Sequence, residues 1–118
     1  MKGDGHANLN GFWHEAQAFL DWLKENKLTN VALMNGDRHW QYHSIDRRRD
    51  REINEFSCGP THDDHIQPVP PDYEGVDRPY AASRGGFMRI AYATDRTLTF
   101  EHFSMDGASL YKYVLKAK

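Results

Sequence analysis

The stretch NVALMNGDRHWQYHSID, residues 30–46, decides which fold the sequence predicts. Residues 30–35 form a short apolar run between two asparagines, which is typical of a strand buried on both faces of an α/β layer. The polar cluster Gly36–His39 follows directly, and residues 40–46 alternate weakly, as a further strand would. Open α/β sheets bind ligands at the carboxyl ends of their strands. The stretch therefore predicts a functional turn after the first strand.

The flanking sequence predicts one helix and further strands. Residues 12–25 carry apolar side chains at helical spacing, with Asn10 as N-cap and an end near Asn26. Residues 53–58 alternate, residues 59–84 hold all five prolines and predict a long loop, and residues 86–94, 97–104 and 109–116 predict an antiparallel meander. The expected fold is α+β, one main helix plus about five strands, in a single domain spanning residues 1–118.

Composition excludes several classes of function. The chain has 118 residues and a net charge of −2, which provides no positive field for nucleic acid or an anionic membrane. No apolar run approaches the length of a membrane span, and the N-terminus has no signal-peptide core, so the chain as it stands is expected to be cytoplasmic. The single cysteine, Cys58, rules out an internal disulfide framework; a structural thiol is favoured over a metal ligand or a nucleophile.

Asp37 and His39 are the first candidates for chemistry. Residues spaced i, i+2 on an extended segment point to the same side, so this carboxylate and imidazole form two metal ligands. Such a donor set suits zinc, iron or manganese. Arg38 lies between them and offers positive charge to a phosphate ester, as does Arg84. The alternative is that Asn-Gly-Asp is ordinary turn chemistry and that His39 is a surface histidine.

Further histidines and acids widen the candidate metal set. Asp4 and His6 repeat the D-x-H spacing near the N-terminus, and His43 follows His39 by four residues. The proline-rich loop contains THDDH, residues 61–65, and its candidate ligands are His62, Asp63, Asp64 and His65. For each group the alternative is a solvated turn or a structural histidine.

The order of these features resembles the C-terminal half of the PhoD-like alkaline phosphatases and phosphodiesterases, a branch of the calcineurin-like metallophosphoesterases. DGHANLNGFWHEAQAFLDWLKENKLTNVALMNGDRHWQYHSID, residues 4–46, matches the family's loop, helix, strand and GDxH motif. EINEFSCGPT, residues 52–61, and RGGFMRIAYATDRTLTFEHFSMDG, residues 84–107, resemble its closing strands. The resemblance implies half of a metallophosphoesterase sandwich that hydrolyses a small-molecule phosphoester with a dinuclear metal centre.

The resemblance also assigns residues. Asp37 and His39 take the place of the family's C-terminal metal-site pair, and Asp4 corresponds to the acid before the helix. The ions expected are zinc first, then iron, manganese or calcium. The family's N-terminal half, with its bridging aspartate and Asn-His pair, has no counterpart in these residues. The sequence therefore predicts a truncated, oligomeric relative, a dimer or larger, whose missing ligands come from the THDDH loop or a second copy; members of the family are often exported.

Overall fold

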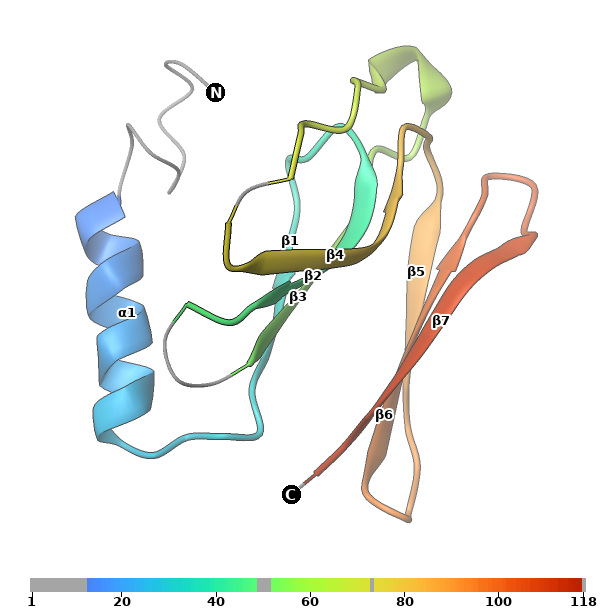
Figure 1. Cartoon of the computed structure of the whole chain (residues 1–118). Helices are drawn as coiled ribbons and strands as arrows, with labels where there is room; N and C mark the ends of the chain where they lie inside the picture. Colours follow the sequence, from blue (N-terminus) through green and yellow to red (C-terminus); the bar gives the residue numbers. More distant parts are fainter. Residues whose placement is uncertain (1–12, 49–51, 73, 118) are drawn as a thin grey trace. The chain divides into compact units, whose positions relative to one another are not determined.

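The computed structural model describes residues 13–48, 52–72 and 74–117 (Figure 1). Its elements, in order, are α1 (Trp13–Glu25), β1 (Ala32–Asn35), β2 (Gln41–Asp46), β3 (Ile53–Cys58), a 3₁₀ turn η1 (Asp63–His65), β4 (Val76–Ala82), β5 (Phe87–Tyr92), β6 (Thr97–Phe103) and β7 (Ser109–Lys116). The chain divides into two units, residues 1–30 and 31–118, which are described separately. The mixed α and β content confirms the predicted α+β class, although the described residues contain seven strands rather than about five.

Helix α1 confirms the predicted amphipathic segment of the first unit. It ends in a Schellman motif: Leu28 N–H donates to Leu23 O, Lys27 N–H donates to Lys24 O, and Lys27 takes a positive φ of 54°. Asn10, the predicted N-cap, lies outside the described residues. No helix among the described residues is long and apolar enough to cross a lipid bilayer.

Sheet A of the second unit contains four strands in the order β1-β3-β2-β4. β1 runs parallel to β3, and β2 runs antiparallel to both β3 and β4. The prediction that the first strand is buried on both faces is wrong. β1 lies at the sheet edge, where the Met34 side chain is 59% exposed. The most buried strand is β2, in which five of six residues are buried.

β4 corrects the prediction that residues 59–84 form one long loop. Residues 76–82 pair with β2 at the other edge of sheet A. Pro79 is compatible with this place because an edge strand needs no N–H from every residue. The register shifts there, so that Arg78 and Pro79 oppose Ser44 alone, as in a β-bulge.

Sheet B is the predicted antiparallel meander, in the order β5-β6-β7. Asp95 caps the first turn by accepting hydrogen bonds from the N–H and hydroxyl of Thr97, and Arg96 takes a positive φ of 66°. Gly107, with φ 86°, supplies the left-handed residue of the second turn. Asp-Arg and Asp-Gly therefore act as the turn signals that the sequence indicated.

Aromatic rings and histidines fill the space between the two sheets. Phe56 of β3 stacks on Phe100 of β6, with ring centroids 3.9 Å apart, and both side chains are buried. His43 of β2 stacks on Phe56 at 4.3 Å and contacts Tyr113 of β7 at the same distance. The core between the sheets is thus built from flat rings, which gain from offset and edge contacts as well as from burial.

A buried glutamine joins the sheets at one corner. Gln41 is fully buried; its Nε2 donates to Phe103 O at 2.9 Å and to Gly85 O at 3.3 Å, while its Oε1 accepts from Tyr80 O–H at 2.8 Å. All these groups belong to sheet A, to sheet B or to the segment between β4 and β5. Because the buried Gln41 side chain satisfies hydrogen-bonding groups from both sheets, this corner is tightly specified.

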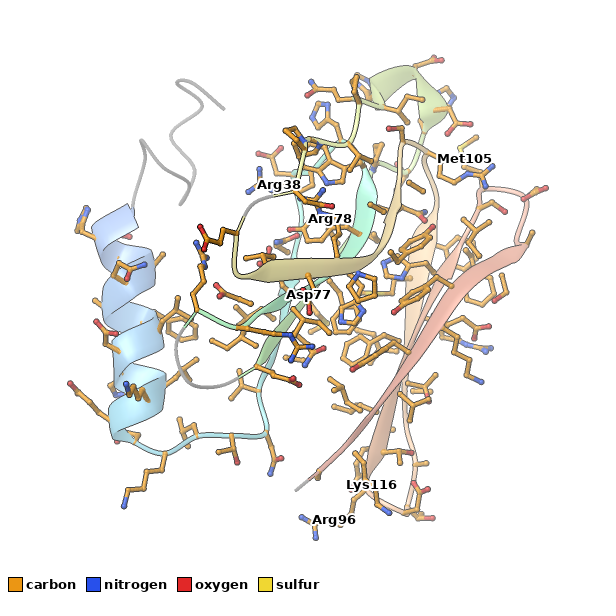
Figure 2. All side chains as sticks on the ribbon, in the orientation of Figure 1. Arg38, Asp77, Arg78, Arg96, Met105 and Lys116 are labelled. Carbon is orange, nitrogen blue, oxygen red and sulfur yellow. The ribbon has the colours of Figure 1, made fainter. Side chains whose placement is uncertain are left out.

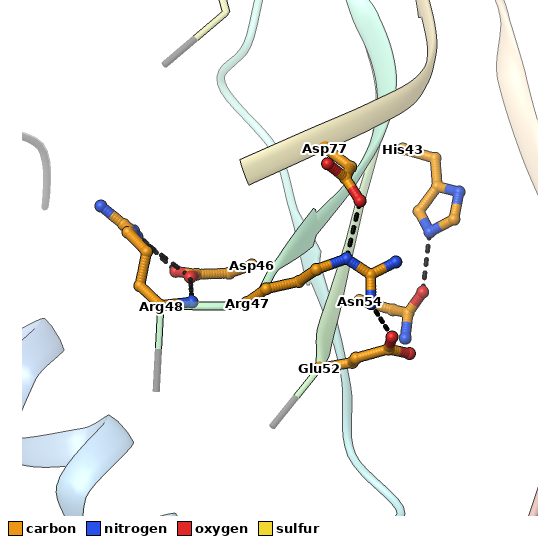
Figure 3. Close-up of polar contacts among 7 residues, drawn as sticks. All are labelled: His43, Asp46, Arg47, Arg48, Glu52, Asn54 and Asp77. Atoms are coloured by element: carbon orange, nitrogen blue, oxygen red, sulfur yellow. Dashed lines mark hydrogen bonds and ion pairs between the residues drawn. The ribbon is translucent and has the colours of Figure 1, made fainter. Parts of the chain in front are cut away.

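The charge run RRRDRE, residues 47–52, follows β2, and its described residues form ion pairs at the surface (Figure 3). Arg47 Nε donates to Asp77 of β4 at 2.6 Å and its guanidinium also pairs with Glu52, while Arg48 pairs with Asp46 at 2.6 Å. All these groups except Asp46 are at least one-third exposed, so the pairs contribute little stability. The described part of the run agrees with the solvated turn that its composition suggests.

Candidate functional site

The GDRH turn lies at the carboxyl ends of two parallel strands. β1 and β3 run in the same direction and are neighbours, yet the chain continues from β1 to β2, on the far side of β3. Residues 36–40 must therefore cross the end of β3. Asp37 lies in this crossing with a positive φ of 59°, a conformation that Asp and Asn adopt more readily than most residues.

The proline-rich loop begins at the same end of sheet A. The chain leaves β3 at Cys58 and turns at Gly59, whose φ is 72°. The loop then passes beside the GDRH turn, where Gln67 N–H donates to His39 O at 2.8 Å and the ring of His65 contacts the ring of His39 edge-on, with centroids 6.4 Å apart. Two candidate ligands from separate sequence clusters thus come together.

The other members of the THDDH cluster have local partners. His62 caps the 3₁₀ turn η1: its Nδ1 accepts a hydrogen bond from Asp64 N–H at 3.3 Å and lies 3.3 Å from the Asp64 carboxylate. Asp63 Oδ1 accepts from Gly85 N–H at 2.7 Å, which fixes the loop against the β4–β5 connection. These contacts shape the loop, whereas His65 is the member directed at the GDRH turn.

Arg38 and Asp37 differ in environment. The guanidinium of Arg38 lies over the ring of Trp40, 5.6 Å from its centroid, and the side chain is half-buried. Such a contact holds the arginine near the turn while leaving its outer face charged. Asp37 is exposed, and His39 is half-buried. The turn therefore presents a carboxylate, an imidazole and a guanidinium within three residues.

A hydrogen-bond cluster that sequence reasoning missed fixes the start of the turn. Asn35 Nδ2 donates to Tyr42 O–H at 2.6 Å and to the Glu55 carboxylate, and Tyr42 O–H donates to that carboxylate at 2.5 Å. Burial and the adjacent Glu55 charge raise the pKa of Tyr42. Asn35 Oδ1 is buried without a hydrogen-bond partner in the described part of the chain. The only sequence signal was that Asn35 precedes Gly36-Asp37 directly.

His43 is placed away from this turn, in the core between the sheets. It is fully buried; Nε2–H donates to Asn54 Oδ1 at 2.8 Å, and Nδ1 accepts from Tyr111 O–H at 2.9 Å. The amide oxygen of Asn54 requires this tautomer. Since both ring nitrogens are engaged, His43 serves the core. Asp4 and His6 lie outside the described residues.

Arg84 lines a pocket of about 220 Å³ beside the loop, together with Asp63, Gly85, Ser104, Met105 and Asp106. Both carboxylates of the pocket have hydrogen-bond partners. Asp63 accepts from Gly85 N–H, and Asp106 accepts from the Ser104 hydroxyl. That hydroxyl, followed by the Ala108 backbone and more weakly by Arg84, lowers the pKa of Asp106. The pocket is therefore polar but already internally paired.

The ligand set at the turn is partial. Within residues 13–48, 52–72 and 74–117, no group of three or more His, Cys, Asp or Glu side chains is positioned to hold a metal ion. His39 and His65 provide two imidazoles, and Asp37 a nearby carboxylate. Their chemistry fits zinc, iron or manganese, but a closed site needs further donors.

Comparison with known proteins adds no relative. No protein-family model, curated protein or solved structure matches the chain. The likeness to PhoD-like phosphatases consequently rests on the residues quoted above.

Proposed function

We propose that this chain contributes Asp37 and His39 as metal ligands to a metal-dependent phosphoester hydrolase. The observation that supports the proposal is the meeting of the GDRH turn and the THDDH loop at the carboxyl ends of β1 and β3, with His65 against His39. Ligand sites of layered α/β folds occupy this position relative to their strands. The remaining donors to the metal ion would come from Asp4, His6 or a second copy of the chain.

The roles of the residues follow from their chemistry. A bound divalent or trivalent ion supplies Lewis-acid polarisation of a phosphoryl oxygen and lowers the pKa of water. His39 and Asp37 would hold the ion, and Arg38 would bind a non-bridging oxygen of a phosphate mono-, di- or triester. Asn35, Tyr42 and Glu55 would act as positioning residues, because their hydrogen bonds fix the strand from which the turn departs.

A second candidate is a metal-binding interaction module without catalytic activity. It is favoured by the incomplete ligand set in the described residues. Turnover of an aryl phosphate diester or triester, lost with a chelator and restored by zinc or manganese, separates the two candidates. Metal binding without turnover supports the module.

Asp37→Asn and His39→Ala are each expected to lower metal affinity at least about tenfold, because the loss of even an outer-sphere partner costs 10–100-fold. Asparagine is chosen at position 37 since it tolerates the positive φ of 59°. Zinc bound per chain is measured by equilibrium dialysis with elemental analysis. Thermal unfolding of the metal-free variants should match that of the wild type, which separates ligand loss from misfolding. Wild-type zinc affinity in both variants would remove the pair from the site.

The two loop histidines are expected to behave differently. His65→Ala should weaken zinc binding about tenfold or more, because its ring faces His39, whereas His62→Ala should leave affinity within about twofold. His62 is the matched control, since it lies in the same loop and caps η1. Titration with a competing chromophoric chelator gives both affinities. Equal effects, or none, would show that the loop does not contribute ligands as proposed.

A further inference from the structure

The edge strands of the two sheets differ in their protection against pairing. β4 carries Pro79, a bulge and the charges of Asp77 and Arg78, and β7 carries Lys112 and Lys116. Figure 2 labels Asp77, Arg78 and Lys116 among them. Proline, bulges and lysine are the devices by which natural sheets prevent edge-to-edge association. These two edges are therefore built to remain unpaired.

β1 and β5 lack those devices. β1 reads ALMN and contains no charge, while β5 reads FMRIAY with one charge, Arg89. That arginine forms an ion pair within the chain with Glu101, at 2.5 Å. Three large apolar side chains of β5 are exposed: Phe87 by 46%, Ile90 by 41% and Tyr92 by 70%. An unprotected edge with exposed apolar side chains is a template for another strand.

The unprotected edges lie on the same side of the stacked sheets. Met34 is the register partner of Phe56, and Ile90 is the register partner of Phe100. Phe56 and Phe100 stack at 3.9 Å, and their register partners on the other side, His43 and Tyr113, contact each other at 4.3 Å. The rows that contain Met34 and Ile90 therefore face each other across the core, with β1 and β5 on the same side. Met34 and Ile90 therefore end these rows on one side, where both are exposed. The exposed apolar surface continues the interior core.

We propose that a second copy of this chain docks here, with β5 of one copy pairing antiparallel with β5 of the other about a two-fold axis at Ile90. Directly opposed residues of two paired strands lie on the same face of the sheet, and side chains alternate between faces along each strand. In a pair of identical strands, the two opposed residue numbers must therefore both be even or both be odd. Centring on Ile90 opposes Met88 with Tyr92 and Arg89 with Ala91, which matches apolar groups on the inner face. Centring on Arg89 would oppose two arginines, and like charges directly opposite are destabilising.

This register makes β5 self-complementary, which is the reason to assign a second copy rather than an unrelated strand. An isologous interface requires each residue and its partner to be compatible in both directions. This register satisfies the condition without an unpaired charge. Ile90 lies opposite Ile90 at the axis, and Met88 lies opposite Tyr92 on either side of it. The result joins two three-stranded sheets into one of six strands, within the usual size of sheets.

Charge substitutions at Ala91 test the register. Ala91 is exposed and would face Arg89 of the second copy on both sides of the axis. Ala91→Lys should raise the dimer dissociation constant about tenfold, since two unfavourable cross-strand pairs form, whereas Ala91→Glu should not raise it. Sedimentation equilibrium of the 13.7 kDa chain at micromolar concentration, with chelator present, measures the constant. The assay is independent of metal and of turnover, so its failure is distinct from failure of the proposed function.

Val114→Lys is the matched control, because Val114 is half-exposed on the protected strand β7. It should leave the dissociation constant within about twofold. A monomeric wild-type chain, equal effects of the two Ala91 variants, or a loss of dimer with Val114→Lys would each overturn the proposal.

Cross-linking gives a second measurement that does not depend on affinity. In a Cys58→Ser background, Ile90→Cys should form a disulfide-linked dimer under mild oxidation, because directly opposed Cβ atoms approach to about 4.5–5.5 Å. Val114→Cys in the same background should remain uncross-linked. The reverse pattern, or no cross-link at position 90 in a folded protein, would contradict pairing about Ile90.

Discussion

Replacing Gly86 with alanine is expected to lower the free energy of unfolding by more than about 4 kcal/mol, or to prevent folding. Gly86 has φ 155°, and an added Cβ would overlap Phe103 O and Gln41 Nε2. Neither group can retreat easily, since Phe103 O belongs to β6 and Gln41 is held by three hydrogen bonds. The substitution therefore forces apart the corner at which the chain passes from sheet A to sheet B.

Gly36→Ala is the matched control for this experiment. A Cβ at Gly36 would meet no atom within 4 Å, so the change should cost less than about 1 kcal/mol. Urea denaturation followed by near-ultraviolet circular dichroism compares the free energies of unfolding of the variants, provided that these depend on urea concentration with the same slope. A Gly86→Ala midpoint close to that of Gly36→Ala would show that the corner yields without loss of packing.

Acidification from pH 7 to pH 5 is expected to destabilise the second unit through His43 and His102. Both are fully buried, and burial lowers the pKa of each imidazole below its usual value. Among the described residues, their hydrogen-bond and ring contacts contain no carboxylate that would stabilise an imidazolium; these contacts include Tyr42, Asn54, Phe56, Ser57, Tyr80, Tyr111 and Tyr113. His102 Nδ1 has no hydrogen-bond partner among the described residues. A proton there would create a buried, unpaired charge.

The sign of this effect follows from proton uptake. Below about pH 6.5 the unfolded chain binds protons that the folded chain excludes, so the free energy of unfolding falls as the pH falls. Each histidine contributes up to about 1.4 kcal/mol per pH unit between its two pKa values. Asp95, Glu101 and Asp106 have lowered pKa values and so titrate below this window.

Urea midpoints at pH 7, 6 and 5 measure the slope. His102→Gln retains a donor for the Ser57 carbonyl, at 3.0 Å in the wild type, and should remove about half of the pH dependence. His14→Gln is the control, because His14 lies on the exposed surface of α1. Constant stability between pH 7 and pH 5, or equal slopes in the wild type and His102→Gln, would contradict the assignment.

The parts of the fold that sequence could predict are those with local signals. Helix α1 has both an apolar stripe and a C-terminal boundary signal, and the meander has Asp95-Arg96 and Asp106-Gly107 at its turns. β4 was missed because Pro79 argues against a strand, and only pairing with β2 shows that the residue lies at an edge. Burial of β1 was overestimated because an apolar run does not show how many neighbours its strand has.

The site was predictable only in part, for a similar reason. The polar cluster after the apolar run identified the turn, and the prolines identified a loop long enough to reach it. The extended backbone that the i, i+2 argument assumed is absent at Asp37, which takes a positive φ of 59°. Which loop histidine does so depends on Gln67 N–H binding His39 O, a contact without a sequence signature. His43 resembled a ligand because it shares a polar stretch with His39, yet strand alternation directs it into the core.

The crossing from β1 over the end of β3 has a consequence for the order of assembly. The β2–β3 pair and the β5–β6–β7 meander join segments close in sequence, so their closure entropy is small. Among the described residues β1 pairs with β3 alone, in parallel, and β2 intervenes between the two strands in the sequence. Parallel pairings of this kind form slowly. The candidate ligands of the GDRH turn follow β1 directly, so we expect the chemistry of the turn to depend on this one parallel pairing.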